Sequence, residues 1–240
     1  MRVKLIRAAY SAAIWCNIAG ERAKFIIEKA TLYIKRVRLH PQIVNDVRMG
    51  LAKGALLHYP INRTEIYMIP MAANTLDISK EQLFYGRVPK IIIMSMLDSE
   101  TVSGVYGKSL FYFKHNNIKH VELRVNGVPK PTLPLTPDFG KGKSCIREYV
   151  SLLEAMNIHA KDAYLPFGYE EFLNGYTFFA WNLTPDGQGQ CQNSGRRGNI
   201  RLDLKFATPT PVGINIVLYC IFDSLVMIDG SGMVHTDYKE

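Results

Sequence analysis

The chain has 240 residues, of which 48% are hydrophobic, 11% aromatic and 21% charged. A chain of this length buries a sizeable core without disulfide staples, and these fractions are typical of globular domains, so extensive disorder and collagen-like or coiled-coil chains are excluded. The formal net charge is +8, and most of it comes from residues 1–40, where nine bases stand against two acids. The sequence has no run of about 18 uncharged apolar residues, so we predict no membrane-spanning helix.

The cysteines indicate a reducing compartment. They are far apart and form no C-x-x-C pair: Cys16, Cys145, Cys191 and Cys220. This spacing argues against a zinc knuckle, a thioredoxin-type site and a dense secreted framework. The N-terminus has a basic start and an uncharged stretch over residues 8–20, but Tyr10, Ser11 and Asn17 interrupt its apolar character. We therefore expect an intracellular product that is not secreted.

The first half of the chain predicts strands around one amphipathic helix. Apolar and charged residues alternate over residues 23–39, which is typical of a strand, and a change of phase predicts a bulge near Lys35 and Arg36. A helix is predicted from Pro41 to Gly54, and its apolar stripe is expected to pack against another part of the protein. Further strands are predicted at residues 3–7, 56–61, 64–69, 90–97 and 118–125. The apolar run 90–97 is expected to be covered on both faces.

The second half begins with a tight turn. Asn126-Gly127 predicts this turn after the strand at 118–125, and the prolines that follow predict an irregular connection over residues 128–138. Ser144 is predicted to cap a second helix. The expected inner face of that helix carries Ile146, Tyr149, Val150, Leu153 and Met156. Strands are predicted at 176–183, 200–206 and 213–228, with a polar, glycine-rich loop over 184–198.

These elements predict an all-β fold. About eight strands, short helices in the connections and no regular strand-helix alternation are typical of an antiparallel sandwich. The pattern by itself leaves jelly-roll, immunoglobulin-like and other sandwiches open.

Several short patterns suggest chemistry, but each has a simpler explanation. The Gly-Lys-Ser runs at 107–109 and 142–144 resemble the end of a phosphate-binding loop, yet Val102 and Pro137 stand where its first glycine is required. His120 and Glu122 project from one face of a strand, with His115 nearby, as two metal ligands do, but solvent-facing polar residues explain them better. We assign no catalytic, cofactor-binding or metal-ligating residue, and we predict that the protein is not an enzyme.

Other charged and aromatic residues have both a structural and a functional interpretation. Glu170 and Glu171 are expected in the first turn of a short helix after Gly168, where negative charge is favoured. The basic stretch 22–38 is read as a solvated strand face, with contact to packaged DNA as a weaker hypothesis. An aromatic cluster is expected either to anchor an interface or to pack in the core: Tyr106, Phe111, Tyr112 and Phe113.

Long collinear stretches carry a family resemblance from about residue 2 to residue 238. They include KATLYIKRVRLHPQIV, YPINRTEIYMIP, QLFYGRVPKIIIMSMLDSETVSGVYGKSLFYFKHNNIKHVELRVNG, PLTPDFGKGKSCIREYVSLLEAM, EEFLNGYTFFAWNLTPD and GNIRLDLKFATPTPVGINIVLYCIFDSLVMID. The sequence resembles the capsid-like proteins of Maverick/Polinton transposable elements. Those proteins resemble double jelly-roll major capsid proteins of eukaryotic DNA viruses such as virophages and adintoviruses.

The resemblance implies a jelly-roll fold and a structural role in a virion. Residues 1–22 resemble the end of a first jelly roll and residues 23–240 the second, so we expect the C-terminal half of a double jelly-roll protein. The implied partners are two further copies in a trimeric capsomer, neighbouring capsomers and a minor capsid protein, with no small-molecule substrate. Three alternatives stay open. One is a lectin-like jelly-roll binding module, which a pocket of convergent polar and aromatic side chains would favour. The others are a metal-dependent jelly-roll enzyme, which bound metal would favour, and a single jelly-roll minor (penton) capsid protein.

Overall fold

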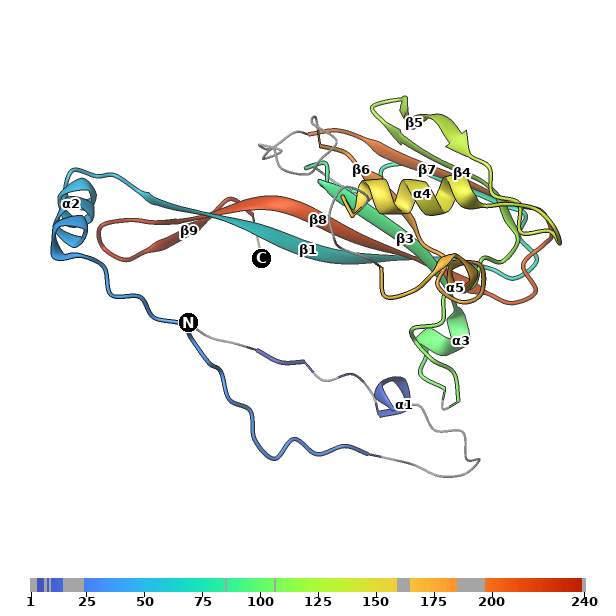
Figure 1. Cartoon of the computed structure of the whole chain (residues 1–240), viewed down its shortest axis with the longest axis horizontal. Coiled ribbons are helices and arrows are strands. Elements are labelled where there is room, and N and C mark those ends of the chain that lie inside the picture. The colour runs from blue at the N-terminus through green and yellow to red at the C-terminus, as the bar shows by residue number, and fades with distance from the viewer. Residues whose placement is uncertain are drawn as a thin grey trace. The chain divides into compact units, whose positions relative to one another are not determined.

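The computed structural model describes residues 4–6, 8, 10–14, 24–84, 86–105, 107–158, 165–184 and 197–238. The chain divides into two compact units, one comprising Met1–Lys24 and Thr64–Phe222 and the other Phe25–Arg63 and Asp223–Glu240. The strands are β1 (Leu57–Met71), β2 (Asp77–Lys80), β3 (Ile91–Asp98), β4 (Ile118–Val125), β5 (Val128–Leu135), β6 (Phe179–Asn182), β7 (Ile200–Phe206), β8 (Ile214–Ile228) and β9 (Val234–Thr236). The helices are α1 (Tyr10–Ala13), α2 (Pro41–Ala52), α3 (Ser99–Val102), α4 (Ile146–Ala155) and α5 (Tyr169–Leu173) (Figure 1).

The first unit is built on two antiparallel sheets. The strand order is β1-β8-β3-β6 in one sheet and β2-β7-β4-β5 in the other. From β1 to β8, consecutive strands alternate between the sheets, except that β4 and β5 form a hairpin within one sheet; β9 then pairs with β8 in the first sheet. A jelly roll is an eight-stranded sandwich made of two Greek keys, and its strands have this order. The predicted antiparallel jelly-roll sandwich with short helices in its connections is therefore confirmed.

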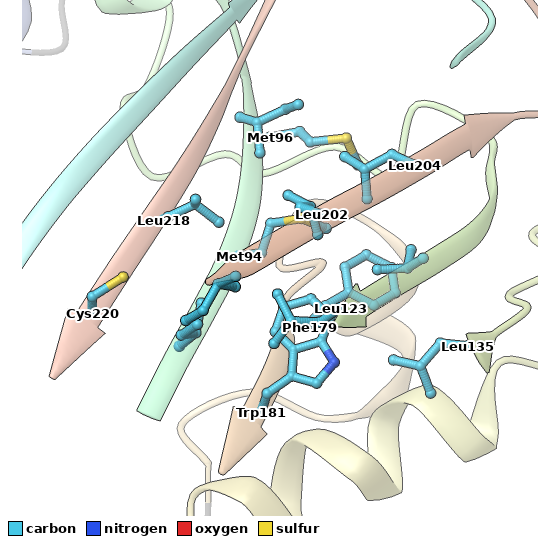
Figure 2. Close-up of a cluster of buried hydrophobic side chains, with 14 of the residues drawn as sticks. Met94, Met96, Leu123, Leu135, Phe179, Trp181, Leu202, Leu204, Leu218 and Cys220 are labelled. Carbon is cyan, nitrogen blue, oxygen red and sulfur yellow. The ribbon is translucent and has the colours of Figure 1, made fainter. Parts of the chain in front are cut away.

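The core lies between the sheets and follows the two-residue period of the strands. In β7 the alternate residues Ile200, Leu202, Leu204 and Phe206 are buried, while the residues between them face outward, as the sequence predicts. Figure 2 shows side chains of β3, β4, β5, β6, β7 and β8 meeting in this core, among them Met94, Leu123 and Phe179.

A second apolar cluster covers the outer face of the sheet at its β6 edge. Helix α4 packs on β6, and Leu152 and Phe172 of α4 and α5 are buried with Ala180. Ile93 of β3 packs against the same cluster, so β3 is covered on both faces, as predicted. Strand β6 itself is a short edge strand of four residues, which limits pairing with other chains.

A turn and a helix start have the conformations that the sequence predicts. Asn126 and Gly127 have φ values of 52° and 81°, which is the left-handed pair that a type I′ hairpin turn needs. In α5, a side-chain oxygen of Glu171 accepts a hydrogen bond from the backbone N–H of Gly168 at 2.8 Å, so the acidic first turn is confirmed. Among the described residues, no helix is long and apolar enough to cross a membrane.

The second unit contains the predicted helix at its predicted limits. Helix α2 begins at Pro41, where the ring of His40 accepts a hydrogen bond from the backbone N–H of Gln42, and Gly54 follows its end with a φ of 84°. No residue of α2 is buried, so its apolar stripe lacks the packing that we expected within the described residues. The ends of β8 and β9 pair through Val226 with Thr236 and Ile228 with Val234.

Four predictions differ from the structure. Residues 24–39 and the described residues of 3–7 form no strand, because alternation alone supplies no hydrogen bonds to a strand. The strands expected at 56–61 and 64–69 are one strand, β1, which continues through Asn62 and Arg63. Residues 128–135 form β5 instead of an irregular connection, because an edge strand tolerates proline.

The fourth difference concerns α4. Cys145, not Ser144, occupies the N-cap position, and the helix buries Glu148, Leu152 and Ala155. Of the expected inner face, Ile146 and Val150 are exposed. The predicted loop at 184–198 lies mostly outside the described residues.

Candidate functional site

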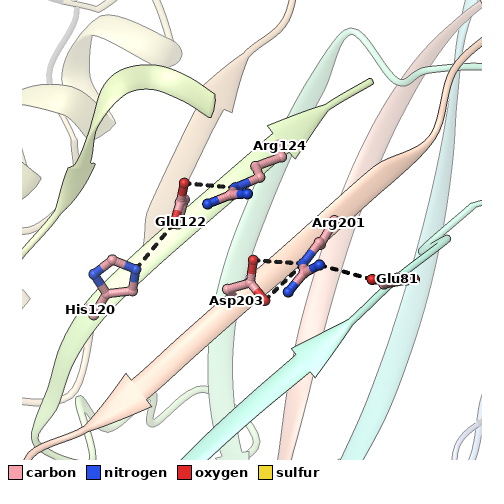
Figure 3. Close-up of polar contacts among 6 residues, drawn as sticks. All are labelled: Glu81, His120, Glu122, Arg124, Arg201 and Asp203. Carbon is pink, nitrogen blue, oxygen red and sulfur yellow. Dashed lines mark hydrogen bonds and ion pairs between the residues drawn. The ribbon is translucent and has the colours of Figure 1, made fainter. Parts of the chain in front are cut away.

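A ladder of alternating charges covers the outer face of the sheet formed by β2, β7, β4 and β5. Glu122 of β4 lies opposite Asp203 of β7, and Arg124 lies opposite Arg201, so like charges face each other across the strands. Each arginine instead binds the acid two residues away on its own strand. Arg124 Nε is 2.8 Å from Glu122 Oε1, and Arg201 Nε is 2.8 Å from Asp203 Oδ2 (Figure 3). These bonds offset the cross-strand repulsion.

The ladder lowers the pKa of both acids. The hydrogen bond from Arg124 lowers the pKa of Glu122, and a weaker bond to His120, at 3.4 Å, acts in the same direction. For Asp203, burial raises the pKa, but the hydrogen bonds from Arg201 and Ser79 outweigh it and the net shift is downward. Arg201 also reaches Glu81 at 2.8 Å. The outer face of this sheet therefore carries a network of paired charges. Such a surface is suited to remain in water or to contact a polar partner.

We expect Glu122→Gln to lower the free energy of unfolding by about 1–3 kcal/mol at neutral pH, because Glu122 is nearly buried and loses charged hydrogen bonds to Arg124 and His120. The native pKa of Glu122 is lowered, so its contribution is present above the ordinary carboxyl pKa and is lost as the pH falls through the native value. Urea unfolding between pH 7 and pH 3 measures this.

The matched control is Glu81→Gln, which removes an exposed carboxylate from the same ladder. Its expected cost is at most about 1 kcal/mol, because exposed ion pairs contribute little. An equal cost for the two substitutions, or a cost for Glu122→Gln that persists in acid, would contradict the assignment.

The structure brings only part of the proposed metal-ligand set together. His120 and Glu122 lie on one face, as predicted, but the ring of His115 stacks on Phe139 at 4.2 Å and accepts a hydrogen bond from the backbone N–H of Asn117. Burial lowers the pKa of His115. Across the residues that the structure describes, no group of three His, Cys, Asp or Glu side chains is placed to hold a metal ion.

Neither Gly-Lys-Ser run is placed as a phosphate-binding loop. In the run 142–144, Ser144 lies before α4, and a stretch without strand structure precedes it where such a loop requires a buried strand. In the run 107–109, Lys108 forms an ion pair with Glu100 of α3. Both lysines therefore belong to surface loops.

Two adjoining pockets lie among loops of the first unit and share Tyr112 and Lys114. One, of about 270 Å³, is also lined by His115, Asn116, Asn117 and Asn174. The other, of about 320 Å³, contains Asp98, Thr101, Lys108 and Ser109. Asp98 is buried; Lys114 Nζ binds its Oδ2 at 2.6 Å, and its Oδ1 has no hydrogen-bond partner among the described residues. Sequence reasoning missed these pockets because their residues come from separate loops.

The predicted aromatic cluster is divided between surface and interior. Phe111 and Tyr112 are exposed, while Phe113 packs against Phe178 with ring centroids 4.7 Å apart. The backbone of Phe113 also binds Gly175 and Thr177. Tyr106 lies outside the described residues. Exposed rings beside a polar pocket are suited to contact a ligand or a partner.

We expect Gly175→Ala to lower the free energy of unfolding by about 1–3 kcal/mol, because Gly175 has a φ of 105° and an added Cβ would collide with the ring of Tyr112. Gly50→Ala is the control: Gly50 lies inside α2, and an added Cβ would meet only the Cβ of Ala55 at 3.9 Å, an ordinary contact, so alanine does not lower stability there. Thermal unfolding of the two variants checks this, and an unchanged midpoint for Gly175→Ala would contradict the described turn.

A long exposed segment is the largest unpaired apolar feature in the described part of the second unit. In residues 26–39 the large apolar side chains are between 55% and 90% exposed: Ile26, Ile27, Leu32, Tyr33, Ile34, Val37 and Leu39. The bases of the predicted DNA-contacting stretch lie among them, and Lys24, Lys29, Lys35, Arg36 and Arg38 are all exposed, while Arg22 lies outside the described residues. The segment therefore combines exposed apolar and exposed cationic side chains.

No family model matches the chain. Over 218 residues it is 22% identical to an uncharacterised protein of Caenorhabditis elegans, in a match that covers 89% of this chain and 52% of that protein. The chain thus spans about half the length of the curated relative that it matches.

The jelly roll is also similar to chains in three solved viral structures. The match to the cryo-EM structure of the Sputnik virophage has a TM-score of 0.46 at 12% identity and covers 77% of this chain and 40% of that one. The match to the PBCV-1 virus capsid has a TM-score of 0.46 at 10% identity and covers 78% and 52%. The match to the mavirus major capsid protein has a TM-score of 0.39 at 13% identity and covers 77% and 41%.

Proposed function

We propose that the chain is a structural protein of the major capsid type, which forms trimeric capsomers that contact neighbouring capsomers in a shell. The observation that carries the proposal is a jelly roll in a chain that also has many exposed large apolar side chains, chiefly in residues 26–39 and in α2. Such a surface is stable in water only when another polypeptide covers it. A shell subunit obtains that cover from its neighbours.

The sequence resemblance supports a more specific form of this proposal. In that form the protein derives from a Maverick/Polinton-type element, residues 1–22 end a first jelly roll, residues 23–240 form the second, and the product resides in a virion within the host cell. A minor capsid protein and packaged DNA are its further partners, and it turns over no substrate. Unchanged affinity for duplex DNA after Lys35, Arg36 and Arg38 are neutralised would remove the DNA contact.

The test is the mass in solution of this chain joined to a first jelly roll of the kind that this proposal places before residue 23. Light scattering on a sizing column is expected to show three copies per particle, and negative-stain electron microscopy is expected to show three-fold tiles. A well-behaved monomer of the joined protein at high concentration would contradict the proposal.

A sugar-binding module is the second candidate, because the two pockets beside Tyr112 combine an exposed ring with asparagines, a lysine and the unpartnered Oδ1 of Asp98. Under this alternative, titration with monosaccharides shifts the amide resonances of Asn116, Asn117 and Ser109, and Tyr112→Ala removes the shifts. The control Phe111→Ala removes a neighbouring exposed ring that does not line either pocket. If no amide resonance shifts at millimolar sugar, the sugar-binding module is excluded.

A further inference from the structure

A pocket of about 220 Å³ opens beside the edge of β6, within the first unit. Strand β6 is the last strand of its sheet, where it pairs with β3. One wall of the pocket is formed by α4 on the outer face of that sheet, with Ser151 and Ala155. The opposite wall lies on the core side and includes Trp181 of β6 and Lys130 and Leu135 of β5. Because the pocket borders both faces of the sheet, it occupies the position of a further strand next to β6.

The main-chain groups of Ala180, which lines the pocket, point toward this position. In an antiparallel ladder, opposite residues alternate between pairs that exchange hydrogen bonds and pairs that do not. The N–H of Leu183 bonds to the C=O of Lys90 at 2.8 Å, which makes these two residues a bonded pair. Two residues earlier, Trp181 makes the next bonded pair with β3, so Ala180 falls between bonded pairs. The N–H and C=O of Ala180 are therefore directed away from β3, where an added strand would bond to them.

The core wall of the pocket holds a buried donor without a partner. Trp181 is 3% exposed, and its Nε1 has no hydrogen-bond partner among the residues that the structure describes. Figure 2 shows this nitrogen on the side of the indole that faces Leu135, which lines the same wall. Buried donors are almost always paired, because an unpaired one loses its bond to water without replacement. The indole N–H therefore calls for an acceptor oxygen from the pocket.

A cation lies on the same wall. Lys130 is opposite Leu123 in the pairing of β4 with β5, and Leu123 is fully buried, so the side chain of Lys130 points to the core side of its sheet. It forms no ion pair in the described part of the chain. An inward-facing lysine by itself protects an edge strand, but that role leaves the N–H of Trp181 unpaired. A carboxylate between the two satisfies both, because it accepts from the N–H and pairs with the ammonium.

We propose that this pocket, the β6-edge pocket, binds a short extended segment of a partner polypeptide, which adds to β6 and places a glutamate side chain between Trp181 and Lys130. The segment's residue opposite Ala180 bonds to its N–H and C=O and turns a small side chain toward Ser151 and Ala155 of α4. The residues on either side face the core wall, since strand side chains alternate. Main-chain bonds supply affinity and the alternate side chains supply specificity. The segment is short because β6 has only four residues.

The first experiment follows the indole N–H resonance of Trp181 in the 240-residue chain. The chain has two tryptophans, so the variant Trp15→Phe, isotope-labelled at the tryptophan nitrogen, leaves a single indole signal. The unlabelled peptide acetyl-Val-Ser-Glu-Ser-Val-amide is expected to move the proton resonance downfield until it saturates, because the N–H gains an acceptor. Lys130→Gln is expected to weaken binding at least about tenfold, because the carboxylate loses its ion pair. The matched control Lys119→Gln removes an exposed lysine of β4 that does not line the pocket, and it is expected to leave the affinity unchanged.

Three further probes separate strand addition from other kinds of binding. The same peptide with leucine in place of glutamate lacks the carboxylate, and the glutamate peptide methylated at both serine nitrogens cannot donate to the C=O of Ala180. Each is expected to bind at least about tenfold more weakly than the glutamate peptide. Sodium acetate, at the concentration that saturates with the glutamate peptide, is expected to leave the resonance in place.

Four results would overturn the inference. They are no shift with the glutamate peptide at millimolar concentration, equal binding of either modified peptide, an equal shift with acetate, and unchanged affinity of the Lys130→Gln variant. The titration does not depend on the mass of the joined protein, so the strand-addition site and the trimer can fail separately.

Discussion

Replacing Phe179 with alanine is expected to lower the free energy of unfolding by about 3–5 kcal/mol. Phe179 is fully buried in β6, pairs with Met94 of β3 and faces the core between the sheets (Figure 2). Its removal leaves a cavity that the strands cannot close, because β6 is also held from outside by α4. Urea unfolding monitored by far-ultraviolet circular dichroism measures the loss.

The control for this prediction is Phe111→Ala. It removes the same ring from a position that is 75% exposed, and its expected effect is within about 0.5 kcal/mol. Equal effects for the two substitutions would show that β6 does not belong to the jelly-roll core.

Labelling of Cys220 by a thiol reagent at pH 8 is expected to be about a thousandfold slower in the folded chain than in the unfolded chain. Cys220 lies fully buried in β8, and burial raises its pKa from 9.0 to about 12, so the reactive thiolate is rare. Burial likewise raises the pKa of Cys145 to about 11, although a backbone hydrogen bond at Asp138 opposes the shift, so its protection is about a hundredfold.

The measurement uses the variant Cys16→Ser/Cys191→Ser, which leaves these two thiols. Mass spectrometry of each peptide over time gives the two rates, with the same chain in urea as the reference. The raised pKa of Cys220 also makes the free energy of unfolding depend on pH. Its contribution is fully present below pH 9 and is lost as the pH rises through the native pKa. Rapid labelling of Cys220 at neutral pH would contradict the register of β8 against β3.

The prediction of individual elements succeeded where a pattern is local. The alternation over residues 200–206 specifies which side of β7 is buried, and Asn126-Gly127 specifies a hairpin turn, since each depends on neighbouring residues only. Likewise, His120 and Glu122 lie on one face because they are two residues apart in a strand. The partner of Glu122 was missed: Arg124 has the same spacing, and that spacing was the available signal.

Prediction failed where an outcome depends on a distant partner. Residues 23–39 alternate as a strand does, but a strand exists only when another segment supplies hydrogen bonds, and within the described residues none does. Conversely, Pro129, Pro131 and Pro134 argue against a strand, yet β5 forms because β4 pairs with it on one side. One pocket beside Tyr112 is lined by residues more than ninety positions apart, from Tyr112 to Thr208. A local sequence pattern cannot predict such a pocket.

By itself, the sequence determined the class of the fold, the limits of α2 and the inward face of β7, because periodicity and turn residues are local properties. Only the tertiary structure decided the strand order that makes the sandwich a jelly roll, the pairing of Ile91 with Ile221, the cover of β6 by α4 and the exposure of residues 26–39. The physical reason is that strands gain their hydrogen bonds and their buried faces from segments remote in the sequence.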